Sequence, residues 1–182
     1  MRYLLIFDTE TNGLLPRYFN SNKDNILNSL HELPYIVQFS CILFDTKTMK
    51  IIEKLDSIVK IPEDVNLSED SIKVHGITKE MTKTGSNIED LLERFDSLYK
   101  KCDILVAHNL QFDSSILKIE YLRNNKNNFD LTKKKNYCTM QNSVDLCNLK
   151  SINSLGIYTK FPKLDELHFK LFQEKPTNLH NS

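Results

Sequence analysis

Two carboxylates, two residues apart, follow the apolar run near the amino terminus of this chain. Asp8 and Glu10 come directly after residues 3–7, whose hydrophobicity favours a buried strand. Side chains two apart in a strand project from one face, so both carboxylates point to the same side at the end of the strand. Carboxylates held this close repel each other, and a divalent cation between them relieves the repulsion. The pair is a candidate metal site, although Asp-x-Glu is also common on solvated surfaces.

A third carboxylate and a histidine occur farther along the chain. Asp113 enters a predicted helix shortly after a short apolar strand and a turn at His108 and Asn109. An aspartate in the first turn of a helix complements the helix dipole. It can also converge with the first pair, because ligands of α/β sheets bind at the carboxyl ends of the strands. His180 lies near the end of the chain, where an isolated histidine is typical of an exposed terminus.

The elements that must position these residues alternate between strands and helices, which predicts an α/β fold with a mixed central sheet. The helix over residues 87–102 is the clearest, because its apolar residues repeat at helical spacing. Residues 1–182 contain no internal repeat or linker, so we expect one domain. The predicted strands cover residues 3–9, 35–44, 51–61 and 104–107, and the predicted helices cover residues 24–33, 68–75, 78–83, 112–122 and 162–172.

Composition and charge narrow the class of protein. The chain has 182 residues, of which 40% are hydrophobic and 26% are charged, as in soluble globular proteins. Its 24 basic residues balance its 24 acidic ones, which excludes nucleic-acid binding by bulk positive charge but not by a local basic groove. Residues 118–135 carry six basic and two acidic side chains. They form either a solvated loop or a patch that meets phosphates.

Targeting signals and cysteine spacing indicate an intracellular protein. The apolar run at the amino terminus ends at Asp8, too early for a secretion signal, and no apolar run approaches the ~20 residues of a membrane span. The cysteines form no CxxC pair and no spacing typical of zinc sites. We therefore expect free thiols in the cytoplasm or nucleus. The four cysteines are Cys41, Cys102, Cys138 and Cys147.

Five segments, in order along nearly the whole chain, resemble the DEDDh group of DnaQ-like 3′→5′ exonucleases. The resemblance implies a ribonuclease H-like fold, in which helices flank the mixed sheet, and metal-dependent hydrolysis of nucleic acid from its 3′ end to nucleoside monophosphates. The five segments are residues 7–14 with Asp8 and Glu10, residues 34–39, residues 74–78, residues 106–113 with Asp113, and residues 164–181 with His180.

The same resemblance implies roles for individual residues. Asp8 would bridge two divalent ions, Mg²⁺ or Mn²⁺, Glu10 would complete their inner shell, and Asp113 would hold the second ion directly or through water. His180 would take the proton of the attacking water, a task suited to a group that titrates near neutral pH. The nucleotide pocket would be lined by Thr9, Thr11, Asn12, Leu14, His75 and Asn109.

The end of the chain departs from the family pattern. The family has a fourth carboxylate five residues after the histidine, whereas this sequence ends at Ser182. We expect a single exonuclease domain, 1–182, truncated within its last motif and impaired in catalysis. Asp145 and Asp165 occupy no matching motif and are poor substitutes. The alternative is a genuine short form, a catalytically impaired module of nuclease fold that binds nucleic acid or a protein partner.

The substrate is expected to be DNA with single-stranded or frayed 3′ ends. RNA is the alternative, because contacts with the 2′-OH group are not visible in a sequence. A further alternative is an α/β domain unrelated to nucleic acid, in which Asp8 and Glu10 are a chance surface pair. Binding of Mn²⁺ that depends on Asp8 would exclude that alternative.

Overall fold

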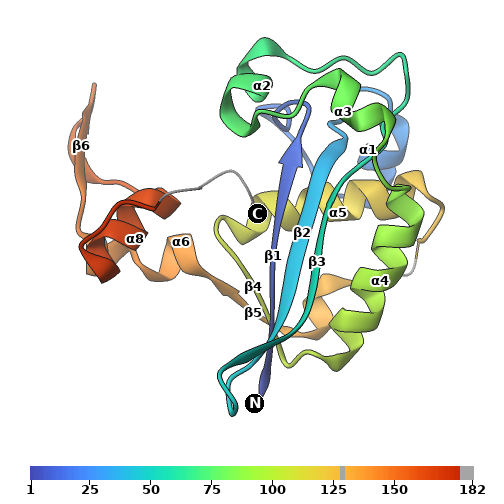
Figure 1. Ribbon diagram of the computed structural model, residues 1–182. Coiled ribbons are helices and arrows are strands. Elements are labelled where there is room, and N and C mark those ends of the chain that lie inside the picture. The colour runs from blue at the N-terminus through green and yellow to red at the C-terminus, as the bar shows by residue number, and fades with distance from the viewer. Residues whose placement is uncertain (128–129, 177–182) are drawn as a thin grey trace.

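The computed structural model describes residues 1–127 and 130–176, and its centre is a five-stranded mixed sheet of order β3-β2-β1-β4-β5 (Figure 1). β1 (Tyr3–Thr11) is antiparallel to β2 (Ile36–Asp45), and β2 is antiparallel to β3 (Lys50–Ile58). β4 (Ile104–Ala107) is parallel to β1, and β5 (Lys135–Cys138) is parallel to β4. The predicted α/β class with a mixed sheet is confirmed.

The central strand β1 divides its side chains between the two faces of the sheet. Phe7 and Thr9 are buried, whereas Asp8 is exposed and Glu10 is partly exposed. This alternation follows from the two-residue period of a strand. Ile6 of β1 pairs with a residue of the parallel strand β4, so both strands end at the same edge of the sheet. Residues that follow the two strands therefore meet at this edge.

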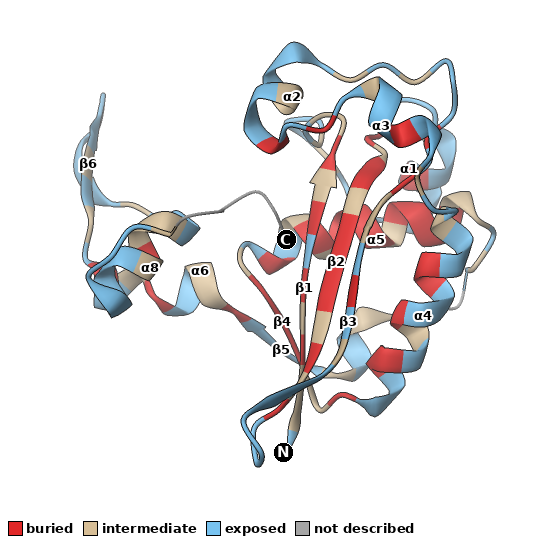
Figure 2. Ribbon diagram, in the orientation of Figure 1, coloured by how far each residue is buried: buried red, intermediate tan, exposed pale blue. Residues whose placement is uncertain are grey.

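Two long helices cover one face of the sheet. α4 (Ile88–Lys101) contacts β1, β2 and β3, and α5 (Leu110–Arg123) contacts β1, β4 and β5. Figure 2 shows the buried residues on the strands and on the sheet-facing sides of these helices. The ring of Phe95 in α4 lies 5.6 Å from the ring of Phe7 and 5.3 Å from that of Phe39, measured between centroids. The main core therefore lies between this face and the two helices.

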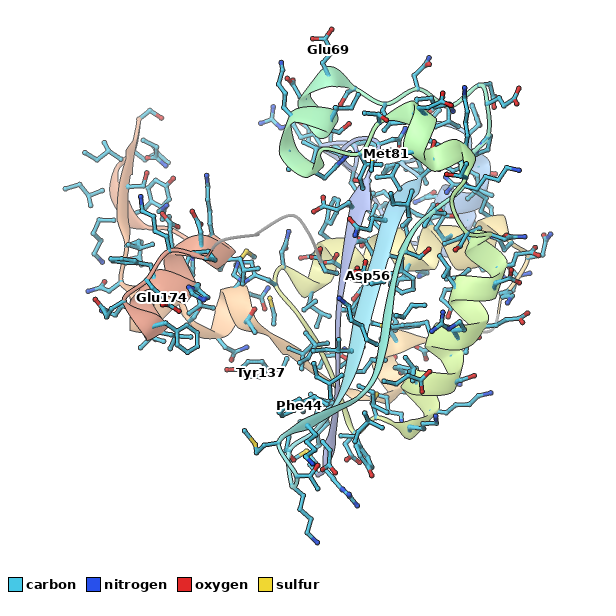
Figure 3. The ribbon with its side chains drawn as sticks, viewed as in Figure 1. Phe44, Asp56, Glu69, Met81, Tyr137 and Glu174 are labelled. Carbon is cyan, nitrogen blue, oxygen red and sulfur yellow. The ribbon has the colours of Figure 1, made fainter. Side chains whose placement is uncertain are left out.

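The other face is only partly covered by the described residues. Phe44 of β2 and Tyr137 of β5 lie on this face by their register with β1 and β4, and both are partly exposed or exposed (Figure 3). A cavity of about 490 Å³ lies along it and extends from Ile51 of β3 to Leu164. This face is therefore more exposed than the helix-covered face, although apolar residues make up much of the cavity lining.

Short helices connect and flank the sheet. In the described part of the chain, no helix is long and apolar enough to cross a membrane. The short elements are α1 (Lys23–Asn28), α2 (Glu69–His75), α3 (Lys79–Lys83), a 3₁₀ turn (Leu131–Lys133), α6 (Thr139–Asn142) and α7 (Val144–Cys147).

After β5 the chain leaves the sheet and projects to one side (Figure 1). β6 (Lys150–Asn153) and β7 (Gly156–Thr159) form an antiparallel hairpin, and α8 (Leu164–Phe172) packs on α7. We call residues 150–163, the hairpin and the segment that joins it to α8, the hairpin arm. β5 and the hairpin were not among the strands predicted from the sequence.

Candidate active site

A pocket of about 610 Å³ opens where β1 and β4 end. This is the edge of an α/β sheet where ligands bind, and segments from five parts of the chain form its wall. The lining comprises Asp8, Thr9 and Glu10 of β1, Val74 of α2, His108, Asn109, Phe112 and Asp113 after β4, Met140 of α6, and Phe161, Pro162, Lys163, Leu164 and Asp165.

Asp8 and Glu10 project into this pocket from the same strand. The residue between them, Thr9, is buried in the opposite direction, as strand alternation requires. Asp8 is exposed and Glu10 is partly exposed, so both carboxylates are accessible to a ligand that enters the pocket. The strand thus presents two carboxylates to the cavity while its other face anchors it in the core.

Asp113 supplies the third carboxylate, and it is buried, with 2% of its surface exposed. Its Oδ1 accepts hydrogen bonds from the backbone N–H of Thr9 at 3.0 Å and from Thr9 Oγ1 at 2.8 Å. Burial, reinforced by the nearby charge of Asp8, raises the pKa of Asp113 to about 8. The two hydrogen bonds from Thr9 oppose this shift without cancelling it. Without a cation, Asp113 is therefore protonated at neutral pH.

A tight turn carries the chain from β4 into α5 and so aims Asp113 at the pocket. Asn109 has a left-handed backbone, with φ of 69°, which Asn tolerates better than most residues. The N–H of Phe112 donates to the carbonyl oxygen of Asn109 at 2.8 Å. The turn places Asp113 in the first turn of α5, where the helix dipole favours a negative charge.

His108 joins three segments at the pocket wall. Its Nδ1 lies 2.9 Å from Thr139 Oγ1, and its Nε2 lies 3.1 Å from the carbonyl oxygen of Pro162. A carbonyl oxygen only accepts, so Nε2 carries the proton. Burial lowers the pKa of His108 below its ordinary value, against the opposing influence of Asp8 and Asp165. His108 is thus a neutral imidazole that ties β4 to α6 and to the end of the hairpin arm.

Comparison with protein families agrees with this geometry. The family model described as Exonuclease (RNase_T) matches residues 5–182. The chain belongs to this exonuclease family. It is therefore a nuclease domain of the hydrolase class, and its resemblance to DEDDh exonucleases of ribonuclease H-like fold is confirmed.

A curated relative and solved structures extend the comparison. The chain is 32% identical over 121 residues to the PolC-type DNA polymerase III of Mycoplasmopsis pulmonis (strain UAB CTIP), and the match covers 66% of this chain and 7% of the relative. It is also similar in fold to Escherichia coli exonuclease I in complex with a dT13 oligonucleotide, with a TM-score of 0.62 and 18% identity over 88% of this chain and 34% of that one. The nuclease domain of 3′hExo, a DEDDh family member bound to rAMP, matches with a TM-score of 0.50 and 18% identity, over 68% of this chain and 60% of that one.

The pocket offers suitable donor types for divalent cations. Carboxylate oxygens are the ligands that Mg²⁺ and Mn²⁺ prefer, and a cation beside Asp113 would favour its ionised form. Among the described residues, however, no three His, Cys, Asp or Glu side chains are arranged to hold a metal ion. The residues fit a hard cation by type, and binding would have to draw the carboxylates of Asp8, Glu10 and Asp113 together.

Several residues predicted for the nucleotide pocket lie outside the wall of this cavity. Thr11 Oγ1 donates to the carbonyl oxygen of Gly13 at 2.6 Å. Asn12 accepts from the N–H of Tyr35 at 2.7 Å and donates to the carbonyl oxygen of Asn66 at 2.9 Å. Asn12 therefore braces the end of β1 against two loops. Its neighbour Leu14 is 85% exposed at the rim of a separate cavity of about 320 Å³.

Two predicted histidines have different outcomes. His75 is buried, and its Nδ1 accepts a hydrogen bond from the N–H of Ile77 at 3.0 Å. Its neighbour Val74 is the residue of α2 that lines the pocket. His180 lies outside the described residues. The structure thus brings together Asp8, Thr9, Glu10, Asn109 and Asp113 from the predicted set.

Sequence reasoning missed the wall formed by residues 161–165. Asp165 occupies no matching motif in the sequence, yet it lines the same pocket as Asp8. Its Oδ1 accepts from the N–H of Glu166 at 2.9 Å. The one available signal was Pro162, which marks the approach to a helix. That signal does not predict which neighbouring residues face the pocket.

The described residues of the basic segment 118–135 are not among those that line the pocket. Lys135 pairs with Ile104 at the start of β4, which is the opposite end of that strand from His108. Lys134 Nζ donates to the carbonyl oxygen of Cys102 at 2.7 Å. The contact of Lys134 therefore lies beside the start of β4, at the end of that strand away from the pocket.

Proposed function

We propose that this chain is a 3′→5′ exonuclease domain that hydrolyses phosphodiester bonds of single-stranded or frayed DNA and releases nucleoside monophosphates. The observation that carries the proposal is the convergence of Asp8, Glu10 and Asp113 on one pocket at the ends of two parallel strands. Three carboxylates around one cavity suit a reaction in which cations neutralise a phosphate.

Individual residues of the chain would have different roles in phosphodiester hydrolysis. Asp8 and Glu10 would hold two divalent ions, Mg²⁺ or Mn²⁺, with Asp113 on the second, and the ions would supply an activated water and neutralise developing charge. Thr9 holds Asp113 in place through two hydrogen bonds. His180 would accept the proton of the attacking water.

The terminal nucleotide would bind against the same wall. Thr9 and Asn109 line the cavity directly. We also propose Thr11, Asn12, Leu14 and His75 as substrate residues, although two of them would act indirectly. Asn12 and His75 already use polar atoms to hold neighbouring backbone, so they would act mainly by shaping the site.

Similarity to other proteins supports the proposed substrate. One similar structure contains a dT13 oligonucleotide and another contains rAMP. The curated relative is a DNA polymerase, which favours DNA over RNA here. Because the chain spans a small part of that relative, we propose it as one domain, of residues 1–182, that belongs to a larger protein. Its four cysteines are free and buried, which supports an intracellular location.

Digestion of end-labelled DNA tests the direction of hydrolysis. A single-stranded oligonucleotide labelled at its 3′ end should release its label as a mononucleotide in the first cleavage, in the presence of Mn²⁺. The same oligonucleotide labelled at its 5′ end should give a ladder that shortens with time. Release of a labelled mononucleotide from the 5′ end, or of internal fragments, would contradict the proposal. An oligoribonucleotide of the same sequence should be digested more slowly.

A second function is favoured by one observation. Because no three described side chains are arranged to hold a metal ion, the chain as it stands could bind nucleic acid without hydrolysing it. This alternative predicts that the oligonucleotide binds with unchanged length after prolonged incubation with Mn²⁺. Shortening of the bound oligonucleotide would exclude it.

A further inference from the structure

The hairpin arm leads directly into the candidate active site. β7 ends at Thr159, and three of the next four residues, Phe161, Pro162 and Lys163, line the pocket. His108 fixes this junction through the carbonyl oxygen of Pro162. A linear substrate whose end lies in the pocket would therefore pass the arm on its way out.

The hairpin arm carries several apolar side chains that are largely exposed. Ile152, Leu155 and Ile157 have 76%, 95% and 74% of their surfaces exposed, and Phe161 is 57% exposed at the pocket rim. A two-stranded hairpin without a packed face is marginally stable in water, and contiguous exposed apolar side chains mark sites of interaction. The arm therefore has the character of a binding surface.

Strand pairing arranges the arm into two faces. Ile152 pairs with Ile157, and Lys150 pairs with Thr159, so all four lie on one face. Lys150 Nζ reaches Thr159 Oγ1 at 2.6 Å along this face. The N–H of Lys160 donates to the carbonyl oxygen of Leu149, which continues the ladder toward the pocket. An apolar pair and an ammonium group thus share one face of a ladder that ends beside Phe161.

The charge of the arm is complementary to a phosphate backbone. Residues 146–164 contain three lysines and no acidic residue. Lys160 is paired with Glu166 at 2.5 Å, but the contact of Lys150 is with a neutral hydroxyl, and Lys163 is exposed at the pocket. The lining of the pocket is acidic and repels a polyanion. Positive side chains outside the pocket mouth would offset this repulsion for a bound strand.

We propose that the hairpin arm is a second nucleic-acid-binding surface, which holds the part of a single strand that lies outside the pocket. Phe161 stacks on a base at the pocket mouth, and Lys150 and Lys163 contact phosphates on either side. Proteins commonly bind single strands without sequence preference through aromatic side chains that lie beside positively charged ones. The identity of the ligand rests on the proposed function, and the placement of the arm does not.

Binding of labelled oligodeoxythymidine tests this proposal. The full chain is titrated against a strand of about 12 nucleotides and against a dinucleotide, in Ca²⁺, with gels to confirm that the strands stay intact. Phe161→Ala should weaken binding of the longer strand about tenfold and weaken binding of the dinucleotide less. Phe172→Ala is the matched control, because Phe172 is also exposed, at 62%, but lies on α8 outside the pocket lining. It should bind both strands as the unmodified chain does.

Salt dependence provides a second test that does not depend on Phe161. Lys150→Gln should reduce the slope of log affinity against log salt by about 0.7 for the longer strand, as expected for one lost phosphate contact. Lys170→Gln, on α8, should leave the slope unchanged. Circular dichroism checks that the variants remain folded, and light scattering reports their mass.

The results of these experiments distinguish the proposal for the hairpin arm from the proposed function. Equal losses for the dinucleotide and the longer strand would assign Phe161 to the terminal-nucleotide site and overturn the proposal. Unchanged binding, with a change of oligomeric mass in the arm variants, would instead assign the arm to a protein contact. If the arm variants bind like their controls while digestion still starts at the 3′ end, the proposed function stands and the arm proposal fails. If binding depends on the arm but even a chain extended through the last motif digests no DNA, the arm proposal stands and the proposed function fails.

Discussion

Thr9 and Asp113 are joined by two hydrogen bonds to one carboxylate oxygen, from the backbone N–H of Thr9 at 3.0 Å and from its Oγ1 at 2.8 Å. The two residues are 104 positions apart in the chain. Their contact connects the central strand to the start of α5. It also limits the rise in the pKa of the buried carboxyl group, because both donors favour the ionised form while burial favours the protonated one.

Removing one of these donors should raise the pKa of Asp113. Thr9→Val deletes the hydroxyl and keeps the shape of the side chain. We expect the pKa of Asp113 to rise from about 8 by roughly one pH unit, equivalent to about 1.4 kcal/mol. Thr9→Ser, which keeps the hydroxyl, should leave the pKa nearly unchanged. Carboxyl resonances followed by NMR during a pH titration measure both. Equal pKa values in the two variants would show that the hydroxyl contributes nothing.

The buried carboxyl group should also make stability depend on pH in a known direction. The folded chain without metal keeps the Asp113 proton up to about pH 8, whereas the unfolded chain releases it near 3.8. The unfolded state therefore binds fewer protons between these values, and the free energy of unfolding falls as pH rises. This group contributes up to about 1.4 kcal/mol per pH unit. Its stabilising effect is complete below pH 3.8 and is lost by about pH 8.

Asp113→Asn isolates this contribution, because the amide cannot ionise but still accepts from Thr9. In EDTA, the variant should be more stable than the unmodified chain at pH 8 and should show a flatter decline between pH 5 and 8, with a difference of about 1 kcal/mol or more. Urea unfolding at several pH values measures the effect. Parallel curves for the two proteins would contradict the raised pKa.

His108 should act by positioning the pocket wall. His108→Ala removes the contacts with Thr139 Oγ1 and with the carbonyl oxygen of Pro162. We expect a loss of stability of about 1–2 kcal/mol and a higher KM for oligonucleotides with a smaller change in kcat. His108→Gln, whose amide can still donate to the carbonyl, should restore part of the KM. A large fall in kcat at constant KM would instead indicate that His108 takes part in the chemistry.

The buried pair of Glu120 and Arg123 should be important for stability. Arg123 contacts Glu120 at 2.5 Å and donates to the carbonyl oxygens of Leu30 and Leu33 at 2.9 and 3.0 Å. Burial raises the pKa of Glu120, and Arg123 opposes that shift. Arg123→Ala leaves a buried carboxylate without its cation, so we expect a loss of about 3–5 kcal/mol. Gln111→Ala, an exposed change on the same helix, should cost less than about 0.5 kcal/mol. Urea unfolding compares them, and similar losses would contradict the account.

Those parts of the fold that depend on local pattern could be predicted from the sequence. The apolar run over residues 3–7 indicates β1, and the two-residue period places Asp8 and Glu10 on one side of it. The helical spacing of apolar residues over 87–102 indicates α4. Each of these patterns reflects burial against the core, which is the signal that a sequence carries most directly.

The remaining parts depend on tertiary contacts or on exposure. β5 has four residues, of which only Cys138 is buried, so no periodicity distinguishes it from a loop. The hairpin of β6 and β7 is almost wholly exposed and has no buried face to create a pattern. The pocket wall at Pro162 is placed by its bond to His108, 54 residues earlier. That Val74 and not His75 faces the pocket follows from the orientation of α2, which the sequence does not encode locally.

The last motif yields a prediction about catalytic rate. If a carboxylate five residues after His180 is required, a chain extended through that motif should digest DNA at least about a hundredfold faster than residues 1–182, because a missing ligand weakens the ion that activates water. The comparison uses one oligonucleotide and equal concentrations of folded protein. Equal rates would show that the described pocket suffices.

The assignment of the active site is tested most sharply by the rate of digestion by Asp8→Asn, in the most active form of the protein, relative to the unmodified protein in Mn²⁺. Asp8 is exposed in the pocket, so the substitution should leave the thermal unfolding curve nearly unchanged. We predict that the rate falls at least about a hundredfold while the protein stays folded. A folded Asp8→Asn variant that digests DNA at an undiminished rate would contradict the assignment of this pocket as the site of phosphodiester hydrolysis.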